Sequence, residues 1–180
     1  MDIIKVLGIL SKEFSAHKIR YAVIGGFAMN ALGLARSTID VDFLVLAQDT
    51  PKLNTLLESL GYSRVYKTEN VSQYTSASHE LGEIDVLHAF RDASLKMLER
   101  SRTVSILNET IVLKVLSPED IIGLKLQASL NDKTRALREM SDINMIMERF
   151  KDKLDWGIIE EHFNIFEQQT LFRELREKYG

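Results

Sequence analysis

Two adjacent glycines, Gly25 and Gly26, separate a short apolar segment, 21–24, from a run of helix-forming residues, 27–32. The apolar segment is typical of a buried strand, so the glycines occupy a strand-to-helix turn. Glycine allows a ligand to approach the main chain closely, and the free amides at the start of a helix attract phosphate. A tight turn without a ligand explains the glycine pair equally well when it is taken in isolation.

Carboxylates follow the glycine pair at the head of the next apolar segment. Alternation over 39–46 predicts a strand with Asp40 and Asp42 on one face, about 7 Å apart. On a later predicted strand, 83–88, Asp85 likewise stands between two apolar residues. Three carboxylates on neighbouring strands would hold a hard divalent cation. Two acids separated by one residue are more often a solvated strand edge, so the prediction depends on their combination with the glycines.

The rest of the chain predicts an α+β protein, in which a mixed sheet is flanked by helices and followed by a C-terminal helical extension. Predicted helices cover 2–16, 27–32, 50–60, 93–99, 118–130 and 134–150, before a helical tail. Predicted strands cover 21–24, 39–46, 83–88, 103–107 and 110–116, and 62–78 carries only weak strand markers. Ser117 and Pro118 form a strong helix start.

Length and composition limit the domain organisation. With 180 residues, of which 45% are hydrophobic, the chain is large enough for one core and too short for two. We therefore expect a core over 1–116 and a helical extension over 117–180 that packs on it as a single compact unit.

Charge and cysteine content exclude several classes of function. The formal net charge of -3 argues against a global basic surface for nucleic acid, and the absence of cysteine excludes disulfides and thiolate metal sites. The N-terminus has no signal-peptide pattern, and no apolar run approaches the roughly 18 residues of a membrane span. We expect a cytoplasmic protein without a membrane partner.

Four charged side chains outside the acidic strands are further candidates. Arg36 precedes the first acidic strand and would either contact phosphate or be a solvated loop residue. Lys125 would either reach a triphosphate or extend its apolar stem past the edge of the core. Arg138 and Asp142 are four residues apart, which favours an ordinary surface ion pair.

These motifs together resemble a known superfamily. Gly25-Gly26, the spacing to Asp40-Val41-Asp42, and the later Ile84-Asp85-Val86 are similar to the signature of the DNA polymerase β-like nucleotidyltransferases. Within that superfamily, Gly-Gly-x-Ala and Arg36-x-Thr38-x-Asp40-x-Asp42 resemble the small bacterial branch related to the abortive-infection (type IV toxin, AbiEii-like) enzymes. The stretches 117–128 and 138–142 resemble the same branch, so the resemblance covers about residues 21–147.

The resemblance implies a nucleotidyltransferase-type sheet and a Mg2+-dependent transfer of a nucleoside monophosphate from an NTP to a hydroxyl. Asp40 and Asp42 would hold Mg2+ on the triphosphate, and Asp85 would join them at a second ion and activate the acceptor hydroxyl. The implied nucleotide-binding residues are Gly25, Gly26, Arg36, Thr38, Lys125, Arg138 and Asp142. Gly26 departs from the many relatives that have serine there, so any hydroxyl contact to phosphate at this position is lost.

The acceptor and the partners remain open at this level. The acceptor would be an RNA end such as that of tRNA, a protein or a small molecule, held by the helical tail or by a second copy in a homodimer. Enzymes of this branch are often the toxin half of a toxin-antitoxin or defence pair, which implies an antitoxin partner. The alternatives are a catalytically silent module that binds nucleotide, RNA or a partner protein, and a small-molecule modifier such as an aminoglycoside adenylyltransferase.

Overall fold

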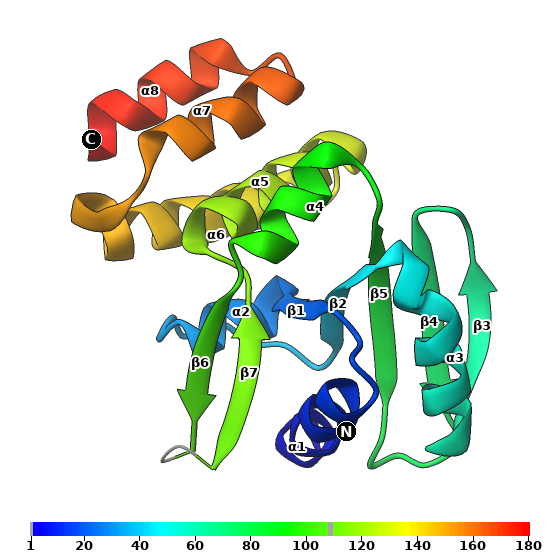
Figure 1. Cartoon of the computed structure of the whole chain (residues 1–180). Coiled ribbons are helices and arrows are strands. Elements are labelled where there is room, and N and C mark those ends of the chain that lie inside the picture. Colours follow the sequence, from blue (N-terminus) through cyan, green and yellow to red (C-terminus); the bar gives the residue numbers. More distant parts are fainter. Residues whose placement is uncertain (1, 108–109) are drawn as a thin grey trace. The chain divides into compact units, whose positions relative to one another are not determined.

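The computed structural model describes residues 2–107 and 110–180, which form two compact units (Figure 1). Unit 1 ends at Leu116, and unit 2 runs from Ser117 to Gly180. The helices of unit 1 are α1 (Ile3–Ala16), α2 (Gly25–Ala31), the 3-10 turn η1 (Ala47–Asp49), α3 (Thr50–Ser59) and α4 (Asp92–Glu99). Its strands are β1 (Tyr21–Ile24), β2 (Val41–Leu46), β3 (Tyr62–Lys67), β4 (Val71–Ser76), β5 (Glu83–Ala89), β6 (Arg102–Ile106) and β7 (Ile111–Val115). Unit 2 contains α5 (Pro118–Asn131), α6 (Ala136–Phe150), the 3-10 turn η2 (Lys151–Lys153), α7 (Trp156–Ile165) and α8 (Gln169–Tyr179).

The strands of unit 1 form one mixed sheet in the order β3-β4-β5-β2-β1-β7-β6. Strand β2 runs parallel to β5 and antiparallel to β1, and β1 runs parallel to β7. The remaining neighbours are antiparallel. The predicted α+β architecture with a mixed sheet is confirmed, and β2 and β5 lie side by side near its centre.

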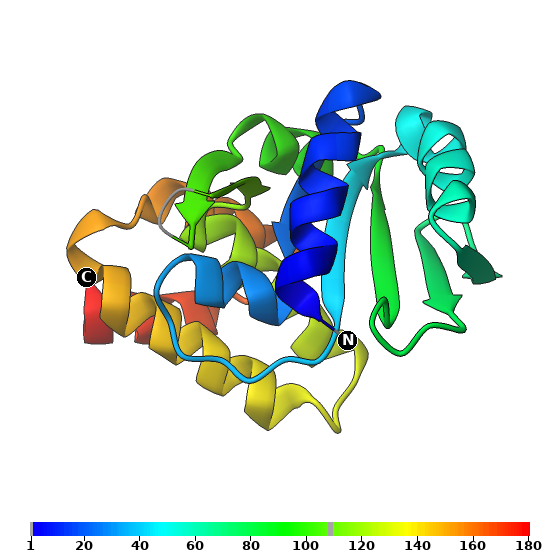
Figure 2. The same cartoon turned by 90° about the horizontal axis from the view of Figure 1, so that it is seen from below.

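One face of this sheet is buried by aromatic packing against α1. Phe14 of α1 contacts the rings of Tyr21 and Phe43, with centroids 4.8 and 5.3 Å apart in edge-to-face geometry. Figure 2 shows α1 and α3 along the same side of the sheet. Because side chains alternate along a strand, Asp42 points to the face opposite that of Phe43.

Two features of the sheet differ from the sequence-based prediction. Strand β2 begins at Val41, which is the first residue paired with β5, and Asp40 lies in a bend before it. Asp40 and Asp42 therefore do not share one strand face as predicted. The weak markers between 62 and 78 form two complete strands, β3 and β4, because β4 is paired on both of its edges. Such pairing partners come from distant segments, which local patterns do not reveal.

Unit 2 begins with a buried polar network at the start of α5. The Ser117 hydroxyl accepts from the Asp120 amide (3.2 Å) and donates to Asp120 Oδ2 (3.0 Å). The other carboxylate oxygen, Oδ1, is 2.9 Å from Nε2 of His162 on α7. Gly123 leaves room for this imidazole, because a Cβ there would lie 2.7 Å from ring atoms. The predicted helix start is confirmed, and Asp120 also holds α7 against α5.

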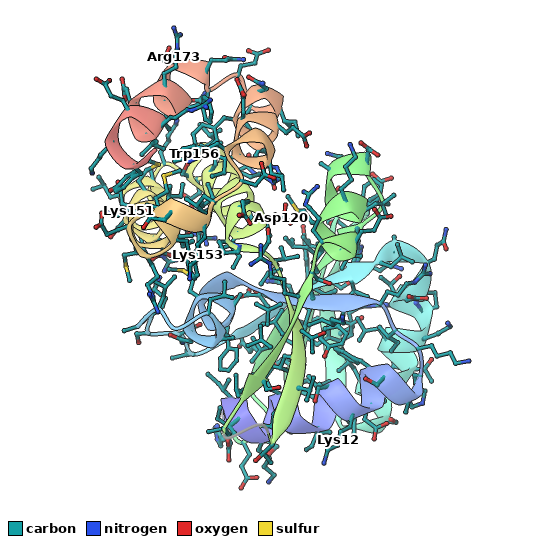
Figure 3. The ribbon with its side chains drawn as sticks, turned by 60° about the vertical axis from the view of Figure 1, so that its left-hand side comes forward. Lys12, Asp120, Lys151, Lys153, Trp156 and Arg173 are labelled. Carbon is teal, nitrogen blue, oxygen red and sulfur yellow. The ribbon has the colours of Figure 1, made fainter. Side chains whose placement is uncertain are left out.

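The predicted helical tail consists of two helices, α7 and α8. Asp155 caps α7 by accepting from the amides of Gly157 (2.9 Å) and Ile158 (3.3 Å). Trp156, labelled with Asp120 in Figure 3, packs its ring against Phe172 of α8 at a centroid distance of 6.1 Å. No helix within 2–107 or 110–180 is both long and apolar enough to cross a membrane.

Candidate active site

Asp42 and Asp85 are brought together by the central pair of parallel strands. They are direct register partners on β2 and β5, and both are half-buried. Neighbouring strands lie about 4.8 Å apart, so the two carboxylates project from the same face at adjacent positions. Parallel strands need a long connection, which explains how residues 43 positions apart in sequence meet here.

Gly25 lies directly beside Asp42. Its neighbour Ile24 is the register partner of Asp42 on β1, and Gly25 itself begins α2 with φ +66°. A Cβ at Gly25 would overlap with Oδ2 of Asp42 and lie 2.8 Å from its Cγ. The backbone conformation and the space taken by the carboxylate both require glycine at this position.

Gly26 has a different steric reason to be glycine. A Cβ there would lie 2.9 Å from Cβ and 3.0 Å from Oγ1 of Thr38. The Thr38 hydroxyl donates to the carbonyl of Asp40 at 3.3 Å, so the loop before β2 passes against the start of α2. The residue before this helix is Ile24, whose side chain cannot accept from the first-turn amides.

Arg36 lies in the same loop, and its backbone is fixed by Asn30 of α2. Asn30 Nδ2 donates to the carbonyl of Arg36 (2.7 Å), and the amide of Arg36 donates to Asn30 Oδ1 (2.8 Å). Asn30 was not predicted as a site residue, although its place one turn after the glycine pair on a predicted helix can be read from the sequence. These two hydrogen bonds fasten the loop between α2 and Asp40 to α2 at Arg36.

Gln73 of β4 is a second residue near the acids that was not predicted from the sequence. Its Nε2 donates to Asp85 Oδ1 at 3.0 Å, from the strand on the other side of β5. The segment around Gln73 carried only weak strand markers, so no register with Asp85 was predicted.

The acidic side chains suit a cation that is bound together with a nucleotide. In the described part of the chain, no three His, Asp or Glu side chains are gathered closely enough to hold a metal ion. Mg2+ is usually bound by one or two carboxylates, with substrate phosphates and waters completing its octahedral set. The carboxylates of Asp42 and Asp85, at neighbouring register positions beside a backbone without a Cβ at Gly25, fit that form of binding.

The three site candidates of unit 2 belong to a charge network around the buried side chain of Glu139. Lys125 Nζ lies 2.6 Å from Asp142 Oδ2 and 2.8 Å from Glu139 Oε2, and its side chain is 9% exposed. Arg135 and Arg138 both reach Glu139 Oε1, at 2.7 and 3.2 Å. These ion pairs join α5 to α6, and nucleotide binding by Lys125, Arg138 and Asp142 stays a prediction from the sequence.

Acid should weaken unit 2 through Glu139. Burial raises the pKa of Glu139, but the hydrogen bonds and charges of Lys125 and Arg135 outweigh it and hold this pKa below its ordinary value of 4.5. The unfolded chain therefore binds the proton more readily. The stabilisation of the folded state by ionised Glu139 is fully present above about pH 4.5 and is lost as the pH falls through the folded-state pKa of Glu139.

Urea unfolding between pH 7 and pH 3 would measure this dependence. Glu139→Gln should flatten the fall in the free energy of unfolding below pH 4.5, because it removes the titrating carboxyl. Glu148→Gln changes an exposed acid of the same helix and should leave the profile as in the parent. If the free energy of unfolding falls equally steeply with pH in Glu139→Gln and in the parent, Glu139 is not the group that weakens unit 2 in acid.

Comparison with solved structures identifies the same fold in several proteins. The antibiotic-resistance factor ANT(2'')-Ia matches with a TM-score of 0.67 at 14% identity, over 100% of both chains. The lincosamide antibiotic adenylyltransferase LnuA, with bound lincomycin, matches with a TM-score of 0.54 at 22% identity, over 79% of this chain and 94% of LnuA. A putative nucleotidyltransferase from Thermotoga maritima matches with a TM-score of 0.59 at 14% identity, over 78% of this chain and 92% of that one.

Sequence comparison gives the family. No curated protein matches the chain significantly. A family model described as "Uncharacterised nucleotidyltransferase" matches residues 5–174, which is nearly the whole chain. The solved structures, at these low identities, show that the fold is shared. The chain therefore belongs to this nucleotidyltransferase family and has the nucleotidyltransferase fold that its central motifs predict.

Proposed function

We propose that this protein is a Mg2+-dependent enzyme that transfers a nucleoside monophosphate from an NTP to an acceptor hydroxyl. The observation that carries the proposal is the register of Asp42 and Asp85 on β2 and β5, with Gly25 beside Asp42. A turn without a Cβ next to two aligned carboxylates offers room for a triphosphate and oxygen ligands for its cation.

In the proposed reaction, the acceptor oxygen forms a bond to the α-phosphorus as the bond from that phosphorus to the pyrophosphate oxygen breaks. Asp85 takes the hydroxyl proton, and pyrophosphate leaves. Asp42, with Asp40 from the preceding bend, would hold Mg2+ on the triphosphate, and two ions would be held when Asp85 also contributes. The bound Mg2+ would neutralise charge that builds on the phosphate oxygens.

The nucleotide-binding residues that we propose in unit 1 lie at the start of α2 and in the loop that follows it. Gly25 and Gly26 would present backbone amides to the phosphates, and the loop with Arg36 and Thr38 would add donors. Asn30 supports this assignment because it fixes the backbone of Arg36. Lys125, Arg138 and Asp142 are included on the basis of sequence resemblance.

The acceptor class is a finer part of the proposal. An RNA end or a protein would suit a toxin of the abortive-infection branch, which would require an antitoxin partner. A small molecule is the second candidate, because LnuA and ANT(2'')-Ia share the fold and LnuA was solved with lincomycin bound. A silent module that only binds nucleotide, RNA or protein is the remaining alternative. Retention of Asp40, Asp42 and Asp85 argues against a silent module, because a module that only binds has no need of a cluster of like charges.

Label transfer tests the proposal. The parent protein is incubated with Mg2+ and each of the four NTPs, labelled at the α-phosphate or at the γ-phosphate, and with total tRNA, cell protein, lincomycin or tobramycin. We expect the α-label to enter one acceptor class and the γ-label to enter none, because pyrophosphate leaves. Transfer of the γ-label would indicate a kinase reaction instead. Nucleotide binding without any transfer would favour the silent module.

A further inference from the structure

Three polar side chains form a row across the centre of the sheet. Gln73 on β4 is the register partner of Asp85 on β5, and Asp85 is the register partner of Asp42 on β2. Directly paired residues in a sheet project from the same face at neighbouring positions. Asp85 is therefore flanked by a carboxylate on one side and by an amide on the other.

The amide at the β4 end of this row is bonded to Asp85. Gln73 Nε2 donates to Asp85 Oδ1 at 3.0 Å. This bond engages Oδ1 of Asp85 from the β4 side, and Asp42 lies on the other side of Asp85, on β2. Gln73 is exposed, so packing in the core does not explain a side chain of this kind at this position.

We propose that Gln73 is a positioning residue that sets the orientation of the Asp85 carboxylate for nucleotidyl transfer. The inference rests on the proposed function of Asp85. A neutral amide is suited to this task, because it restricts rotation of the carboxylate and leaves its negative charge available for a cation or for the acceptor proton. Lysine or arginine at this place would instead compensate that charge. Residues that orient metal-binding carboxylates typically contribute 10- to 100-fold to activity or to metal affinity.

Kinetic comparison of three variants tests this role. Gln73→Leu removes the donor at similar size, and Gln73→Glu places a second carboxylate against Asp85. Thr75→Val is the matched control, because Thr75 lies on the same strand and face but pairs with Glu83. We expect kcat to fall about 10- to 100-fold for Gln73→Leu and further for Gln73→Glu. The KM for NTP should stay within about twofold, because the phosphate contacts remain.

Titration with Mn2+ in the presence of NTP and without an acceptor, followed by electron paramagnetic resonance, provides a readout that does not require transfer. The Kd for Mn2+ should rise about tenfold or more for Gln73→Leu and stay at the parent value for Thr75→Val. If the parent binds Mn2+ but transfers no nucleotide, the proposed function fails, and the Mn2+ data alone decide the role of Gln73. The inference is overturned if Gln73→Leu and Thr75→Val agree in both kcat and Kd, or if the parent binds no Mn2+.

Discussion

Asp42→Asn should reduce nucleotidyl transfer by about 100- to 1000-fold while the protein remains folded. The substitution removes a ligand charge at the centre of the site, and the loss of a preorganised electrostatic contact has this typical size. Asp42 is also the register partner of Asp85, and like charges directly opposite each other in a sheet are destabilising. The free energy of unfolding should therefore be unchanged or slightly higher than that of the parent.

The control for this prediction is the same chemical change at an exposed acid. Asp92 lies in the first turn of α4, its side chain is 84% exposed, and it pairs with Lys96 on the surface. Such surface pairs contribute little to stability. Asp92→Asn should therefore keep the parent activity, and its free energy of unfolding should stay within about 1 kcal/mol of the parent value. Assays of α-label transfer and urea unfolding check both variants. Parent-level transfer by Asp42→Asn would show that Asp42 is not part of the active site. Loss of folding would show that Asp42 has a structural role.

Gly25→Ala should reduce transfer by about 100-fold and lower the free energy of unfolding by about 1–2 kcal/mol. The stability loss comes from the positive φ of +66°, which disfavours any residue with a Cβ. The activity loss has a separate cause, because the new methyl group would occupy the place of Asp42 Oδ2 and force that carboxylate to move. Displacement of a reacting group by about 1 Å can cost this much in rate.

Gly33→Ala separates the two effects. Gly33 also has a positive φ, +84°, but nothing lies within 4 Å of the position of a Cβ there. This variant should lose a similar amount of stability and keep parent-level transfer. Thermal unfolding and label transfer on the two variants give the comparison. Equal activities for Gly25→Ala and Gly33→Ala would show that Gly25 is required only for its backbone conformation. Its proximity to Asp42 would then have no role in the reaction.

Local signals were enough to predict much of unit 1. The helix that begins near Pro51 and the strand over 21–24 were anticipated, because caps, proline positions and apolar periodicity act over a few residues. The glycine pair and the acids of 40, 42 and 85 were identified in the same way. These motifs predicted a nucleotidyltransferase, which the family match over residues 5–174 supports, and the abortive-infection branch stays a prediction.

The contacts that organise the candidate site depend on pairing between distant segments. No local pattern could assign Gln73 to Asp85, because the register of β4 on β5 is set by the whole sheet. The same is true of Lys125. The sequence suggested a contact with a triphosphate or packing along the edge of the core, whereas in the structure its Nζ lies beside two buried carboxylates of α6. Residue types and their spacing therefore identify the acids and glycines of this protein. Which oxygen of Asp85 is held, and why Gly25 tolerates no Cβ, follow from the packing of strands in three dimensions.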